Sequence, residues 1–205
     1  MRVLLSPRVE AIPGAGEVAV LLAGLQEDLV SLARAGVTNV ARRLSPAEVH
    51  LVCRAFSGSG AGDDVVGYVC SGRRLWSDSG GMVEPGGRLL PVADHVNLTW
   101  ISPLAGPNDD SQGPRFTSVA GIYRPKLVHS LLSRTPALEV SGVVLQVGDI
   151  WSLTGFEEHV ASGLGANWVS DELVPVVLPV AHRGCAVAAV LLEERGAMGE
   201  RGKDL

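Results

Sequence analysis

Short runs of β-branched and aliphatic residues alternate along this chain with longer runs in which apolar residues recur at helical spacing. This alternation is typical of a sheet covered by helices. The runs that predict buried strands are residues 65–70, 89–92, 143–147 and 186–192. The runs that predict helices are residues 25–34, 46–54, 125–133 and 155–164. The pattern therefore predicts an α/β fold of three layers (α/β/α), with a mixed sheet and flanking helices.

Two segments refine the helix prediction. Ser45 is a favourable N-cap for residues 46–54, because Pro46 takes the first helical position and Glu48 completes a capping box. Residues 174–183 have the composition of a further helix, which Pro179 would kink. The 205 residues suit one domain with one core, so we expect a single domain over residues 1–205, with 196–205 as a flexible polar tail.

Charge and apolar content exclude some partners. The formal net charge is -5, and lysine and arginine form no cluster larger than isolated pairs. Nucleic-acid backbones reward clustered cations, so we expect no nucleic-acid partner. No apolar run is long enough to cross a bilayer, so we expect no membrane partner either.

Cysteine usage bears on metals and location. Cys53, Cys70 and Cys185 show no CxxC spacing. An odd, sparse count predicts reduced thiols in a cytoplasmic protein, not a disulfide framework or a zinc site. The histidines show no metal-binding spacing, so we expect no metal and no cofactor.

Residues 94–116 read DHVNLTWISPLAGPNDDSQGPRF. This segment resembles a loop of trimeric-type purine nucleoside phosphorylases, which reads Asp-His-Ile-Asn-Leu, then Asn-Pro-Leu-x-Gly-Pro-Asn-Asp, then Arg-Phe-Pro. The matching residues are Asp94, His95, Asn97, Leu98, Pro103, Leu104, Gly106, Pro107, Asn108, Asp109, Arg115 and Phe116. The resemblance extends weakly over residues 46–195 and does not reach 1–45. It implies a nucleoside-phosphorylase-like fold.

The resemblance also implies an assembly. In the family, the phenylalanine that matches Phe116 reaches across a subunit boundary and covers the neighbour's base pocket. It therefore implies a homo-oligomer, a trimer, with a small-molecule substrate. The alternative is that these loop residues only preserve the fold.

The phosphate-binding apparatus of the family is largely replaced. The phosphate loop Gly-Ser-Gly-Leu-Gly has no counterpart, since residues 23–26 read Ala-Gly-Leu-Gln, and the family's arginine-x-histidine pair is missing. Where the family has Asn-Ala-Ala-Gly, this chain has residues 70–73, Cys-Ser-Gly-Arg. Where the family has Met-Ser, it has Asp171 and Glu172.

The purine site departs from the family as well. The purine-binding Phe-Glu pair corresponds to Ser152 and Leu153, and the purine-binding asparagine corresponds to Arg195. Trp100 lies inside the matched loop and Trp151 lies beside the former purine site. With Phe116 these tryptophans predict a wider, more apolar pocket. The alternative places tryptophans in the core or at a subunit interface, above all Trp168.

Glu172 is the most informative replacement. The family's serine at this place holds phosphate near the start of a helix. A carboxylate there would occupy the anion site itself and repel a phosphate. We expect Asp171 and Glu172 to face the former phosphate cavity as an acid and a base, with Arg73 or Arg195 paired to one of them. In the alternative, both acids point outward and cap the helix.

These observations predict a repurposed enzyme that acts on a small organic molecule by general acid/base chemistry, without phosphorolysis. Cyclisation, elimination, isomerisation and hydrolysis all fit, and a place in secondary-metabolite biosynthesis is an analogy. The alternatives are a non-catalytic ligand-binding or scaffold protein, and a genuine purine nucleoside phosphorylase or nucleoside hydrolase. The candidate catalytic residues are Asp171 and Glu172. The candidate substrate-binding residues are Cys70, Ser71, Arg73, Trp100, Phe116, Trp151, Leu153, Val169 and Arg195.

Overall fold

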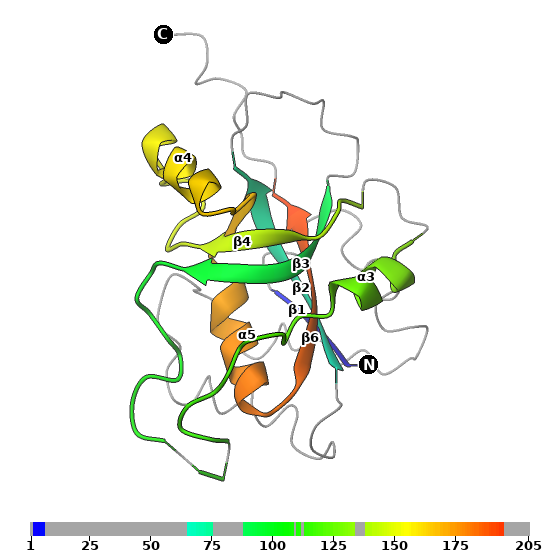
Figure 1. Ribbon diagram of the computed structural model, residues 1–205, viewed down its shortest axis with the longest axis vertical. Helices are drawn as coiled ribbons and strands as arrows, with labels where there is room; N and C mark the ends of the chain where they lie inside the picture. Colours follow the sequence, from blue (N-terminus) through cyan, green and yellow to red (C-terminus); the bar gives the residue numbers. More distant parts are fainter. Residues whose placement is uncertain are drawn as a thin grey trace, which may run out of the picture.

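A computed structural model describes residues 2–6, 65–75, 88–108, 110–111, 113–133 and 138–194. Six strands and three helices follow one another in these residues (Figure 1). In chain order they are β1 (Arg2–Leu5), β2 (Val65–Arg74), β3 (Leu89–Asn97), α3 (Pro125–Leu131), β4 (Gly142–Gln146), α4 (Gly155–Gly163), β5 (Trp168–Ser170), α5 (Leu173–His182) and β6 (Ala186–Glu193). None of the helices in these residues is long and apolar enough to span a membrane.

The strands form one mixed sheet in which the series of strand pairings closes on itself. Strand β2 is parallel to β1 and β6 and antiparallel to β5. Strand β3 is antiparallel to β6 and parallel to β4, which is parallel to β5. Strands β2, β5, β4, β3 and β6 therefore make a closed circuit, and β1 adds to it from outside.

Gly72 marks the point where β2 leaves β6 and turns to β5. Residues 65–72 pair with β6, whereas Arg73 and Arg74 pair with β5. A Cβ atom at Gly72 would lie 2.5 Å from Cδ2 of Leu191 and 2.6 Å from the carbonyl oxygen of Val169. Only glycine fits where the two strands approach so closely.

Helices cover both faces of the sheet. Figure 1 shows α5 and α3 on opposite sides of β2 and β6. Alternate residues of β6 divide accordingly, because side chains alternate across a strand. Val187, Ala189 and Leu191 pack in a cluster with α5, and Ala188, Val190 and Leu192 pack in another with α3. A third cluster joins α4 to β4 and β5. The predicted three-layer α/β fold is confirmed.

The predicted elements that fall within the described residues agree with the structure except at some boundaries. Four predicted strands are present, although β2 continues to Arg74 and β3 to Asn97. Helices α3, α4 and α5 lie where helices were predicted, and α5 continues through Pro179. Strands β1 and β5 were not predicted, because runs of four and three residues are too short to show a period. The predicted helices at 25–34 and 46–54 lie outside the described residues.

Candidate functional site

A buried carboxylate lies where the ends of β2 and β5 meet the beginning of α5. Oε2 of Glu172 accepts a hydrogen bond from the backbone N–H of Ser71 at 2.9 Å and another from the Ser71 hydroxyl at 2.8 Å. The Ser170 hydroxyl donates to the Ser71 carbonyl at 2.8 Å and accepts from the Glu172 N–H at 3.1 Å. Glu172 is 2% exposed. Its carboxylate is therefore held inside the protein by donors from β2.

The Glu172 side chain does not cap the first turn of α5. Glu172 is the N-cap residue, but its carboxylate makes no capping hydrogen bond. The N–H of Val174 donates instead to Oε1 of Gln146 at 2.9 Å, and Pro175 has no N–H. Asp171 and Glu172 are both buried, at 3% and 2% exposure. The two acids therefore do not point outward, and Glu172 does not cap the helix.

Cys70 lies beside these acids in the interior. Burial raises the pKa of its thiol well above the ordinary value, and the negative charge of Glu172 raises it further. Its side chain belongs to the cluster that packs against α5. A thiol held protonated in an apolar cluster packs as a small apolar side chain and is a poor nucleophile.

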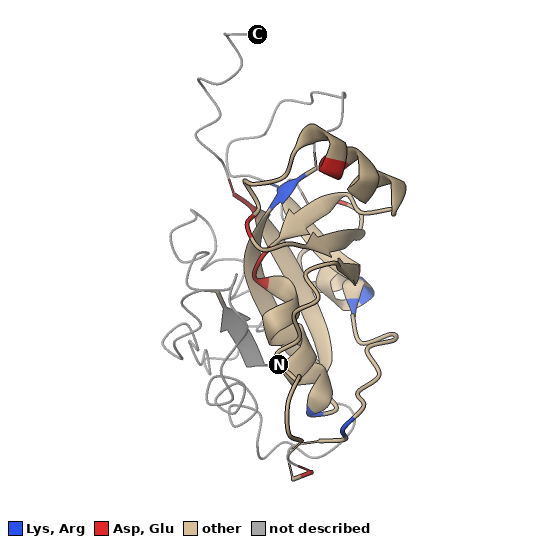
Figure 2. Cartoon of the chain, turned by 90° about the vertical axis from the view of Figure 1, so that its left-hand side faces the viewer, with Lys and Arg blue, Asp and Glu red and all other residues tan. Residues whose placement is uncertain are grey.

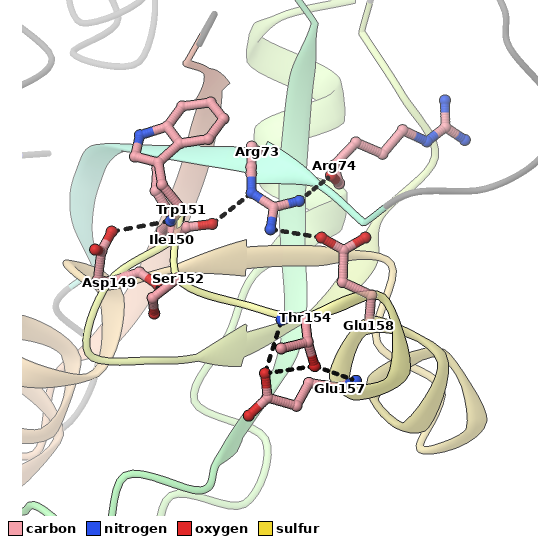
Figure 3. Close-up of polar contacts among 9 residues, drawn as sticks. All are labelled: Arg73, Arg74, Asp149, Ile150, Trp151, Ser152, Thr154, Glu157 and Glu158. Atoms are coloured by element: carbon pink, nitrogen blue, oxygen red, sulfur yellow. Dashed lines mark hydrogen bonds and ion pairs between the residues drawn. The ribbon is translucent and has the colours of Figure 1, made fainter. Parts of the chain in front are cut away.

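Arg73 follows two residues after Ser71 but turns towards α4 (Figure 3). Its Nε donates to the carbonyl oxygen of Ile150, and its Nη2 lies 2.6 Å from Oε1 of Glu158. The guanidinium carbon lies 5.6 Å from the centroid of the Trp151 ring, within the range of a cation–π interaction. The predicted pairing of Arg73 with Asp171 or Glu172 is therefore not present. Arg73 contacts Glu158, Trp151 and the carbonyl oxygens of Ile150 and Arg74 instead.

The segment from Asp149 to Leu153 is a tight turn that leads into α4. Oδ1 of Asp149 accepts from the Trp151 N–H at 2.9 Å, and its carbonyl accepts from the Ser152 hydroxyl at 2.9 Å (Figure 3). Leu153 packs against the cluster under α4. The turn leaves the Trp151 ring 41% exposed. Trp151 is thus exposed beside α4, with the largely buried Arg73 guanidinium next to its ring.

Comparison with known proteins identifies the fold. No protein-family model matches the chain. The purine nucleoside phosphorylase of Anopheles gambiae is 31% identical over 114 residues, which are 52% of this chain and 32% of that protein. Purine nucleoside phosphorylase 1 of Bacillus subtilis (strain 168) is 28% identical over 119 residues, which are 55% of this chain and 43% of that protein.

Solved structures cover more of the chain. The Schistosoma purine nucleoside phosphorylase in complex with hypoxanthine superposes with a TM-score of 0.66 at 16% identity, covering 93% of this chain and 75% of that one. The guanosine complex gives a TM-score of 0.62 at 21% identity, covering 75% and 56%. This chain has the purine nucleoside phosphorylase fold. It spans about a third to two fifths of the curated relatives it matches.

The loop that carries the family motif is fixed to the rest of the phosphorylase fold at its two ends. Nδ1 of His95 and the hydroxyl of Tyr123 lie 2.8 Å apart, and the hydroxyl of Thr117 lies 3.0 Å from Nδ1 of His182. Burial lowers the pKa of His95, which the nearby charge of Asp94 partly offsets, and burial raises that of Tyr123. These contacts give His95 a structural place in the loop.

Other predicted site residues lie elsewhere. Trp100 and Phe116 are 95% and 87% exposed. Val169 is fully buried in the cluster under α4. Arg195 lies outside the described residues. Trp168 is fully buried and donates its ring N–H to Glu139 at 3.2 Å, in agreement with the core alternative.

Sequence reasoning missed three polar residues of the site. Tyr68 donates its hydroxyl to the Glu172 carbonyl at 2.9 Å, and Ser170 and Gln146 make the bonds given above. For Tyr68 and Gln146 the available signal was a polar side chain within a run of residues that predicts a buried strand. Ser170 lies in β5, which is too short to be predicted. The lysines and arginines of the described residues are scattered over the fold (Figure 2). Within the same residues no group of histidine, cysteine and acidic side chains has a metal-binding arrangement.

Proposed function

We propose that this protein uses the purine nucleoside phosphorylase fold to act on a small organic molecule without phosphorolysis. The observation that supports the proposal is the Glu172 carboxylate, which accepts both the N–H and the hydroxyl of Ser71. By the resemblance, Glu172 and Ser71 stand where the family has a phosphate-binding serine and the amide that follows an asparagine. The carboxylate of the chain itself thus takes the donors that an anion would use.

Electrostatics weigh against a phosphate at the same place. Two like charges 4 Å apart repel by about 4 kcal/mol at an effective dielectric constant near 20. Each negative charge on phosphate would therefore weaken its binding by about a thousandfold. The first turn of α5 offers little compensation, because Val174 donates to Gln146 and Pro175 lacks an N–H.

Glu172 is the proposed general base. Hydrogen bonds from Ser71 favour the ionised carboxylate, which is the form that accepts a proton. Asp171, buried next to it, is the proposed acid. By the resemblance, the carboxylate stands where the phosphate nucleophile would sit. A base in that position can activate water, so hydrolysis is the reaction we favour among the four classes considered. A cytoplasmic location and a single domain are part of the proposal.

A scaffold or ligand-binding protein without activity is the second candidate. It is favoured by Arg73 and Glu172, whose charged groups both bond within the chain, to Glu158 and Ser71 respectively. Polar side chains that bond to one another have fewer hydrogen-bond donors and acceptors left for a substrate. The two candidates make different predictions for Glu172→Gln, since only an enzyme loses turnover with its ligand still bound.

We further propose a homo-oligomer, a trimer, because Leu98, Trp100 and Phe116 of the motif loop are 49%, 95% and 87% exposed. Apolar exposure of this size is typical of interaction surfaces. Light scattering at micromolar concentration tests this, and a stable monomer would rule it out.

The test of function starts with the protein as purified from its expression host. We expect no phosphorolysis of inosine, guanosine or adenosine at millimolar phosphate. Native mass spectrometry and a thermal-shift screen of bases, nucleosides and phosphate then identify what binds. Turnover in the ordinary enzyme range of about 1–10³ per second with phosphate would overturn the proposal. Phosphate-independent release of a base from a nucleoside would establish hydrolysis.

A further inference from the structure

Ser170 lies between the two residues of the candidate site that bond to each other. Its hydroxyl donates to the Ser71 carbonyl at 2.8 Å and accepts from the Glu172 N–H at 3.1 Å. The Ser71 N–H and hydroxyl in turn donate to Oε2 of Glu172 at 2.9 and 2.8 Å. The three residues therefore form a closed ring of hydrogen bonds, in which each residue bonds to the other two.

The ring lies beyond the end of the ladder between β2 and β5. On β2 that ladder takes in Arg73 and Arg74, whereas Ser71 pairs with β6. Ser170 is the last residue of β5. Its side-chain hydroxyl therefore connects β2 to the start of α5 at a point where the backbone ladder between β2 and β5 has ended.

The ring is closed to solvent. Ser71 and Ser170 are 0% exposed and Glu172 is 2% exposed. A serine hydroxyl can donate and accept at the same time, and Ser170 does both within the ring. The Tyr68 hydroxyl also donates to the Glu172 carbonyl, at 2.9 Å. The N–H, the carbonyl and the carboxylate of Glu172 are thus each bonded to a different residue.

We propose that Ser170 is a positioning residue, whose hydroxyl orients the two Ser71 donors and thereby sets how tightly they bind a carboxylate. The inference rests on the proposed function, in which the carboxylate that Ser71 binds is the base, Glu172. Donors that are oriented before an anion binds lose little freedom on binding it. A functional group has to be held by its neighbours within about 0.5 Å of its working geometry, and Ser170 holds the Ser71 carbonyl and the Glu172 N–H.

A hydroxyl that only stabilised the fold would behave differently. Its loss would lower the free energy of unfolding but leave the affinity of the folded site for an anion unchanged. A positioning hydroxyl changes that affinity, because without it the Ser71 N–H and hydroxyl no longer point to one place. The affinity of the Ser71 donors for an added carboxylate therefore separates the two roles.

The probe is sodium formate, titrated into the isotopically labelled full chain, with the nuclear magnetic resonance signal of the Ser71 amide as the readout of binding. Glu172→Ala frees the Ser71 donors for formate. In the double variant Glu172→Ala/Ser170→Ala, we expect formate to bind at least about tenfold more weakly, equivalent to the loss of about one hydrogen bond. Sodium chloride at equal ionic strength corrects for the effect of salt.

Tyr123→Phe, added to Glu172→Ala, is the matched control. It also deletes one buried hydroxyl, but that hydroxyl lies 2.8 Å from Nδ1 of His95. The affinity for formate should therefore stay that of Glu172→Ala, although the fold loses a hydrogen bond.

The outcomes separate this inference from the proposed function. If Glu172→Ala binds no formate, the Ser71 donors are not an anion site, and the proposed function loses its support together with the role of Ser170. If formate binds Glu172→Ala and the double variant equally, or if Tyr123→Phe weakens binding as much as Ser170→Ala, the positioning role is overturned and the proposed function stands.

If the double variant does not fold, amide hydrogen exchange in Ser170→Ala decides, since this variant keeps Glu172. The Ser71 N–H should exchange faster by a larger factor than the Val69 N–H of the same strand, because the Ser170 hydroxyl acts locally on the bond between Ser71 and Glu172. An equal factor at both amides would reduce Ser170 to a support of the fold and overturn the positioning role.

Discussion

Replacing Glu172 by alanine tests whether its carboxylate fills an anion cradle, by which we mean an anion-binding site formed by the N–H and the hydroxyl of Ser71. The change removes the acceptor of two hydrogen bonds, 2.9 and 2.8 Å long, and leaves the donors of Ser71 in a fully buried position. Each orphaned buried donor costs about 1–3 kcal/mol, so the pair costs about 2–6 kcal/mol. Removing a buried charge relieves its own desolvation cost. We therefore expect the free energy of unfolding to fall by an amount in the lower half of that range, about 2–4 kcal/mol. This corresponds to a decrease in Tm of about 4–16 °C.

The assay is urea unfolding followed by circular dichroism, with sodium formate as a replacement carboxylate. Formate at ten times its Kd should raise the free energy of unfolding of Glu172→Ala by about 1.4 kcal/mol. Sodium chloride at equal ionic strength should not raise it. The wild-type chain, whose cradle is filled, should respond alike to both salts. Glu172→Gln is the matched control, because its amide oxygen still accepts hydrogen bonds.

A double-mutant cycle with Ser71→Ala isolates the contact. The two changes should be coupled by about 1–3 kcal/mol, because they remove the two ends of one hydrogen bond. Three results would refute the proposed anion cradle. The first is a loss of unfolding free energy below about 0.5 kcal/mol for Glu172→Ala. The others are additive effects of Glu172→Ala and Ser71→Ala, or equal stabilisation of the wild-type and Glu172→Ala proteins by formate.

Further predictions concern single positions. Gly72→Ala should destabilise the fold by about 1–3 kcal/mol or more in urea unfolding, since its Cβ would overlap Leu191 and the Val169 carbonyl; an unchanged midpoint would contradict this. The pKa of His95 is lowered from 6.5 in the folded protein, so the unfolded chain takes up that proton first as the pH falls. Stability should therefore decline as the pH drops through 6.5, less so in His95→Gln, and parallel pH profiles would count against it. The buried, protonated Cys70 thiol should react with a thiol reagent at pH 8 only as fast as the chain unfolds, so rapid labelling mapped to Cys70 would be the contrary result. Arg73→Met should cost about 1–3 kcal/mol by removing the bonds of Arg73 to Glu158 and to the Ile150 carbonyl, and a chemical denaturation curve measures this against Arg74→Met.

The sequence by itself determined the fold class. Four strands and three helices of the described residues were read from periodicity, because a period of two or 3.6 is written into consecutive residues. The loop motif pointed to the phosphorylase fold through identities at fixed spacing, such as Asp94, His95 and Asn97. The replacement at Glu172 could be named for the same reason, since position in a matched pattern needs no coordinates.

Only the tertiary structure decided which groups meet. Glu172 bonds to Ser71, 101 residues away in the chain, and Arg73 pairs with Glu158, 85 residues away. Ser71 and Arg73 differ by two positions and would share one face of a regular strand. Strand β2 leaves β6 for β5 at Gly72, however, and beyond that point Arg73 turns towards α4. Hydrogen-bond partners are set by strand register and helix placement, which bring distant segments of the chain together. The residue pattern of one segment does not show which other segment it will contact.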